Sequence, residues 1–106
     1  MAKRDNEKTK QLINAVMALR SAKEAKRFFR DLLTEEEIIE FSKRWQAAKM
    51  LNNGISYADI EKETGLSSRT IARVAKWLND GMGGYKLIIN RINSHHKKSS
   101  LGKGLS

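Results

Sequence analysis

Proline occurs nowhere in this 106-residue sequence, so the residue that most strongly interrupts a helix is missing. The chain is instead rich in Ala, Lys, Glu, Leu and Ile, and 31% of its residues are charged. Such a composition favours helix, and no stretch alternates apolar and polar residues as a half-buried strand does. The sequence therefore predicts an all-α fold, and its length predicts one small domain.

Capping patterns mark where the helices begin. A Ser or Thr followed three residues later by an acidic residue satisfies the free N–H groups of a first helical turn, and this occurs at Ser21, Thr34 and Ser56. Ser67 opens a further helix without that acid. Apolar residues then recur every three to four positions, and segments such as Asn52-Asn53-Gly54 end the pattern. About six helices are predicted, over residues 6–20, 22–33, 35–52, 57–64, 68–79 and 84–92.

Positive charge is concentrated at the two ends of the chain. Lys and Arg number 21 against 12 Asp and Glu, which gives a net charge of +9. Residues 1–33 and 81–106 each carry +5, whereas residues 34–53 carry −1 and residues 54–80 carry none. This charge suits a polyanionic partner: the ends are expected to contact phosphates around a central recognition element, or else to be solvated. Residues 1–92 are predicted to form the helical domain, and residues 93–106, which are polar and aperiodic, a disordered basic tail.

Residues 56–79 have the pattern of a helix-turn-helix, two short helices joined by a tight turn. Gly65 stands in the turn, where a positive φ is needed. The apolar residues that would hold the two helices together are Ile60, Leu66, Ile71 and Val74. Glu61 departs from the pattern, because a small residue usually stands at that place. Helix pairs of this size also occur in purely structural bundles.

The second helix of this motif has an outer face suited to DNA. Residues 67–79 carry three cations and no acid, and a recognition helix enters the major groove by its N-terminal end. Arg69 can bond to guanine or to a phosphate, and Lys62 on the preceding helix is expected to contact the backbone. The alternative for each is a solvated surface side chain. The predicted DNA-binding residues are Ser67, Ser68, Arg69, Thr70, Arg73 and Lys62.

From about Leu33 to Leu78 the sequence resembles the Trp repressor family, and most of all its Gram-positive branch called YerC/YecD. The resemblance implies an all-helical, intertwined homodimer that represses transcription at a palindromic operator on double-stranded DNA. The matching residues are Leu33-Thr34, Arg44, Ile55-Ser56, Ile60, Glu63, Gly65 and Thr70-Ile71-Ala72-Arg73.

The resemblance also bears on the effector. In tryptophan-sensing members two arginines enclose the indole, and these correspond to Arg44 and Arg73. A serine that helps to hold the amino group corresponds to Trp77, and a pocket glycine to Val74. Both changes add bulk, so L-tryptophan is not expected as co-repressor, and another small-molecule effector is left open. Trp77, alone or with Val74, is expected to fill the pocket from within, or else to be an ordinary core aromatic.

Other classes of function lack a pattern in this sequence. Without cysteine, only His95 and His96 suggest a metal site, and they lack helical spacing and a third ligand. The acids of residues 35–37 suit a first helical turn, and the segment of residues 81–84 lacks the Lys-Ser/Thr ending of a phosphate loop. No cofactor, metal or enzymatic activity is expected. No apolar run approaches the ~20 residues that span a bilayer, and no signal peptide follows the N-terminus, so the cytoplasm is the expected compartment.

We therefore expect a sequence-specific DNA-binding regulator, a homodimeric repressor that uses a helix-turn-helix. One alternative is a protein that binds nucleic acids without sequence preference, for which the affinities for operator and random DNA would be equal. The other is a helical protein-interaction module, which would not bind duplex DNA even at low salt.

Overall fold

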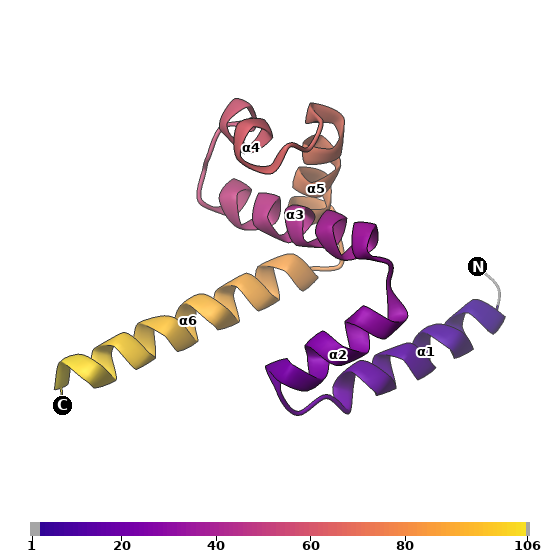
Figure 1. The fold of residues 1–106 in the computed structure, drawn as a ribbon. Helices are drawn as coiled ribbons and strands as arrows, with labels where there is room; N and C mark the ends of the chain where they lie inside the picture. Colours follow the sequence, from indigo (N-terminus) through magenta and orange to yellow (C-terminus); the bar gives the residue numbers. More distant parts are fainter. Residues whose placement is uncertain (1–2, 106) are drawn as a thin grey trace. The chain divides into compact units, whose positions relative to one another are not determined.

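The computed structural model describes the backbone of residues 3–105 and the side chains of residues 6–94. This part of the chain contains helices and no strands (Figure 1), which confirms the prediction of an all-α fold. None of the helices described is long and apolar enough to cross a membrane. The six helices are α1 (Lys3–Met17), α2 (Ala22–Leu32), α3 (Glu35–Asn52), α4 (Tyr57–Thr64), α5 (Ser68–Asp80) and α6 (Gly84–Leu105).

The predicted caps form at the starts of α2, α3 and α4. At α3 the cap is reciprocal: the N–H of Glu37 donates to Thr34 Oγ1 (3.1 Å), and the N–H of Thr34 donates to Glu37 Oε1 (2.9 Å). Ser21 accepts from the N–H of Glu24 at the start of α2, and Ser56 caps α4 in the same way. Each such cap contributes about 0.5–2 kcal/mol to the stability of its helix. These local bonds explain why the three helix starts could be placed from sequence.

Two helix ends differ from the prediction. α1 ends at Met17 rather than residue 20, because its last turn tightens and the N–H of Leu19 donates to the carbonyl of Val16. α6 continues to Leu105, so the predicted helix end at residue 92 is wrong. Residues 93–101 contain neither Pro nor Gly. Loss of apolar periodicity there removes a packing face without interrupting the helix itself.

The chain divides into two compact units, one up to Ile39 and the other from Glu40. The first unit contains α1 and α2, and its Phe28 and Phe29 rings lie 5.7 Å apart between centroids. None of the side chains described in this unit is fully buried. An apolar row on α1 is exposed: Leu12, Ile13, Val16 and Met17.

The second unit holds the buried core. Ala47 and Ala48 of α3 have no exposed surface, and their small side chains allow other helices to approach α3 closely. Trp45 stacks on Tyr85 with 6.3 Å between ring centroids, which joins α3 to the start of α6. α4 and α5, seen beside α3 in Figure 1, contribute most of the other core residues, and α6 contributes Ile89. The remaining core residues are Ile60, Leu66, Ile71, Val74, Leu78 and Ile89.

The core assignment predicts unequal effects of two truncations. Ile71 has no exposed surface, so Ile71→Ala leaves a cavity and should lower the free energy of unfolding by about 2–5 kcal/mol. Met82 is fully exposed, so Met82→Ala should change it by less than about 0.5 kcal/mol. Urea unfolding followed by circular dichroism measures both. Equal losses in the two variants would contradict the placement of the core.

Candidate nucleic-acid interface

The turn between α4 and α5 begins at Gly65. This residue has φ +77° and caps α4, and its N–H donates to the carbonyl of Glu61 at 2.8 Å. A Cβ at this position would meet only Lys43 Nζ, 3.8 Å away. Glycine is therefore required for the left-handed backbone and not for space. The helix-turn-helix predicted for this part of the chain is confirmed.

Thr64 closes the turn from inside. Its hydroxyl donates to the carbonyl of Ile60 at 2.7 Å and accepts from the N–H of Leu66 at 3.1 Å. The side chain is buried, so these two bonds also satisfy a polar group that would be costly to leave unpaired. Thr64 was not among the residues predicted from the sequence. Its position could have indicated its role, because Thr64 is a hydroxyl residue that directly precedes the turn glycine and lies between the packed residues Ile60 and Leu66.

Ser67 and Thr70 hold the start of α5. Ser67 Oγ accepts from the N–H of Thr70 at 3.2 Å and donates to Thr70 Oγ1 at 3.1 Å. Thr70 is half-buried, whereas Ser68 beside it is exposed. The hydroxyl proton of Ser67 is thus used within the helix cap, while the hydroxyl of Thr70 keeps its own proton for another acceptor.

The outer face of α5 is a row of cations. Arg69, Arg73 and Lys76 are spaced i, i+4 and i+7, so they share one face of the helix. All three are exposed, and none forms an ion pair with a residue in the described part of the chain. The opposite face is the buried one, which carries Ile71, Val74 and Leu78. Lys76 was not among the predicted DNA-binding residues, although its spacing from Arg69 and Arg73 could have identified it.

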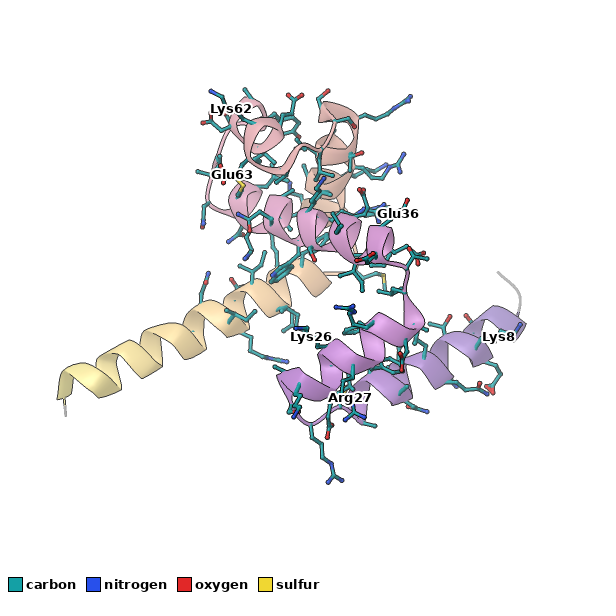
Figure 2. The ribbon with its side chains drawn as sticks, viewed as in Figure 1. Lys8, Lys26, Arg27, Glu36, Lys62 and Glu63 are labelled. Carbon is teal, nitrogen blue, oxygen red and sulfur yellow. The ribbon has the colours of Figure 1, made fainter. Side chains whose placement is uncertain are left out.

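α4 differs from α5 in the sign of its net charge. Lys62 is exposed, as predicted, and points away from α3 (Figure 2). Three acidic residues accompany it on this short helix: Asp59, Glu61 and Glu63. The side chain of Glu61 is exposed, so no small residue is needed at this place and the departure from the motif is harmless. Because α4 is acidic overall, the positive surface of the motif is largely that of α5.

The residues that correspond to an effector pocket have different surroundings in this chain. Arg44 is half-buried: its Nε lies 3.4 Å from Glu40 Oε2, and its guanidinium lies 5.4 Å from the centre of the Phe41 ring. Arg73 is exposed on α5, and Val74 is buried in the core. The Glu40–Arg44 pair was missed by the sequence analysis, although its i,i+4 spacing is the one that helical ion pairs use.

Trp77 lies on an open surface. Its side chain is 48% exposed, so within this chain it neither belongs to the core nor fills an enclosed pocket. It lines a hollow of about 720 Å³ between the end of α5 and the start of α6, together with Met82, Tyr85 and Ile88. Lys76 and Asp80 also contribute to this hollow. Arg44, Arg73 and Val74 do not.

No group of three or more metal-ligating side chains occurs in the part of the chain that the structure describes. The adjacent His95 and His96 considered above lie outside the described side chains. The candidate site is therefore the outer face of α5 with the turn that precedes it.

Three comparisons relate the chain to known proteins. A family model described as Trp repressor protein matches residues 7–93. The uncharacterized protein YerC of Bacillus subtilis (strain 168) is 40% identical over 90 residues, which are 85% of this chain and 86% of YerC.

Solved structures agree with this relationship. A TrpR-like protein from Eubacterium eligens ATCC 27750 superposes with a TM-score of 0.79 at 39% identity, over 82% of this chain and 90% of that one. A protein from Staphylococcus aureus, proposed to be a Trp repressor, superposes with a TM-score of 0.78 at 36% identity, over 88% and 96%.

The geometry of the turn predicts that replacing two different glycines with alanine has unequal effects on the free energy of unfolding. Gly65→Ala should lower the free energy of unfolding by about 1–2 kcal/mol, because an L-residue is strained in the left-handed region. Gly84, the first residue of α6, has no positive φ and open space around its Cα. Gly84→Ala should therefore be neutral or stabilising. Thermal unfolding of both variants tests this, and a Gly65→Ala protein as stable as the parent would show that the turn does not need glycine.

Proposed function

The chain belongs to the Trp repressor family, and on that basis we propose that it is a transcriptional repressor that recognises a palindromic operator through α5. The family is one of DNA-binding regulators. The observation that carries the proposal is the cationic row of Arg69, Arg73 and Lys76. It faces outward along a helix whose other side is locked into the core.

The proposed roles follow from position along α5. Ser68 and Arg69 stand in the first turn, which is the part of a recognition helix that meets base edges. Arg69 can bond bidentately to guanine. Arg73, one turn later, and Lys62 on α4 are assigned to phosphates, which fix the orientation of the protein on the duplex. Ser67 acts as the cap that sets the start of α5, and Thr70 is assigned a contact through its remaining hydroxyl proton.

The proposal includes a homodimer. A palindromic operator needs two recognition helices about 34 Å apart, one for each successive major groove. The exposed apolar row of α1 and the absence of a buried side chain in the described part of the first unit support this state. Apolar surface of this kind is commonly covered by another protein surface.

L-tryptophan is not part of the proposed mechanism. An arginine that encloses an indole must have its guanidinium available, whereas that of Arg44 already has Glu40 and the Phe41 ring beside it. The bulk of Trp77 in place of the serine of tryptophan-sensing members supports the same conclusion.

Base recognition by Arg69 is tested with duplexes selected from a random pool. Arg69→Ala should weaken binding to the selected duplex by about 1–3 kcal/mol and binding to mixed-sequence DNA by much less. Arg69→Lys keeps the charge and loses the bidentate geometry, so it should also lose selectivity. Fluorescence anisotropy measures the six affinities, those of the parent protein and of the two variants for each duplex.

The outcomes of this experiment separate the alternatives. Equal losses on both duplexes would make Arg69 a phosphate contact. Equal affinities of the parent protein for both duplexes would indicate binding without sequence preference, and no binding at low salt would indicate a protein-interaction module.

A second test concerns the effector. Titration of the protein with L-tryptophan in a calorimeter should give no saturable heat at micromolar concentration, because the guanidinium of Arg44 is paired within its own helix. Glu40→Ala frees that guanidinium and is the matched variant. Saturable micromolar heat with the parent protein would contradict the proposal that repression is independent of tryptophan.

A further inference from the structure

The outer face of α2 carries a second row of cations. Lys23, Lys26, Arg27 and Arg30 are spaced i, i+3, i+4 and i+7. At about 100° per residue they fall within an arc of about 100° on the helix surface. All four are exposed, and Figure 2 labels Lys26 and Arg27 on this helix. The apolar residues of α2, including Phe28 and Phe29, lie around the opposite side, which gives a strongly amphipathic helix.

No cation of this row forms an ion pair with another described residue. Lys23 with Arg27 and Lys26 with Arg30 are like charges at i,i+4, an arrangement that destabilises a helix. In the described part of the protein the ion pair found is Glu40–Arg44, and none of the four α2 cations has one. The two acids of α2 do not interrupt the row. Glu24 Oε1 accepts from the N–H of Arg20 at 2.9 Å, and Asp31 stands at the edge of the row; both acids line a shallow hollow together with Arg27.

The other cations in the charged ends do not form such a face. In α6, Lys86 and Arg91 are five residues apart, which places them about 140° apart around the helix. In α1, Lys8 and Lys10 are two residues apart and point to nearly opposite sides. Apart from the recognition row of α5, α2 is therefore where the described side chains gather positive charge on one face.

We infer that the outer face of α2 binds the phosphate backbone of duplex DNA, as a contact that is independent of sequence and adds to recognition by α5. The inference rests on the proposed function. The row runs from Lys23 to Arg30, seven helical steps or about 10 Å. Phosphates follow one another continuously along the duplex. Such a contact therefore needs no fixed register with the bases. A helix that binds a membrane surface inserts its apolar side, whereas Phe28 and Phe29 of α2 are half-buried in the protein.

The test uses the full chain and a mixed-sequence duplex of about 30 base pairs, three helical turns. Two double variants, Lys23→Gln with Arg27→Gln and Lys26→Gln with Arg30→Gln, each remove two charges from the row. Affinity is measured by anisotropy between about 50 and 200 mM NaCl, and each variant should lower the salt slope of log K by about 1.8 for each bound chain. On the selected operator duplex the affinity should fall by the same factor, because the contact does not distinguish bases.

The control is Lys86→Gln with Arg91→Gln, which makes the same change in net charge away from the row and should alter the slope by less than about 0.5. A variant with Lys26→Arg and Arg30→Lys keeps both charges and should keep the parent slope. Circular dichroism should show unchanged or higher thermal stability for the Gln variants, because they remove like-charge repulsion. If DNA binding weakens while the helix remains intact, the weaker binding reports the loss of a contact between α2 and DNA.

Three results would overturn the inference. Slopes of the α2 variants equal to that of the Lys86/Arg91 control would show that the row is only solvated. Loss of binding to phosphatidylserine vesicles with unchanged DNA binding would make it a membrane face. A parent protein that binds no duplex at low salt would overturn the proposed function as well, whereas Arg69-dependent selectivity with unaffected α2 variants would overturn this inference alone.

Discussion

The left-handed backbone at Gly65 is the constraint on which the rest of the second unit depends. It ends α4 and turns the chain within three residues, and the hydroxyl of Thr64 bonds to both sides of the turn. Ser67 then starts α5 at a fixed residue. Because the last residue of α4 and the first residue of α5 are both set by hydrogen bonds, the direction of α5 follows from local geometry and not from packing alone.

Fixing the start of α5 also fixes what each side of it faces. A helix with buried residues at 71, 74 and 78 must carry residues 69, 73 and 76 on its outer side, because both sets follow the same 3.6-residue period. The core thus orients Arg69 and Arg73 without contacting their charged ends. The acids of α4 add an electrostatic contrast, so that positive charge in the motif is concentrated on one helix.

The cationic side chains of this protein differ in whether they have an acidic partner. Arg44 is held by Glu40 inside α3, whereas the cations of α5 and of α2 form rows that have no ion-pair partner among the side chains the structure describes. In the proposed complex one row supplies base recognition and the other supplies affinity through phosphates. Such a division would make specificity depend on α5 and the response to salt depend on both.

The sequence by itself determined the helical class, four capped helix starts and the position of the turn, because caps and glycine conformation depend on a few neighbouring residues. It also identified Ile60, Leu66, Ile71 and Val74 as packed residues. Tertiary structure alone decided that Trp77 is exposed. Trp77 follows the apolar spacing of α5 closely enough to suggest a core position, and only the arrangement of distant segments shows which side chains are covered. The end of α6 could not be predicted from sequence for a different reason. Apolar periodicity indicates where a helix packs, and α6 continues beyond the point where that periodicity ends.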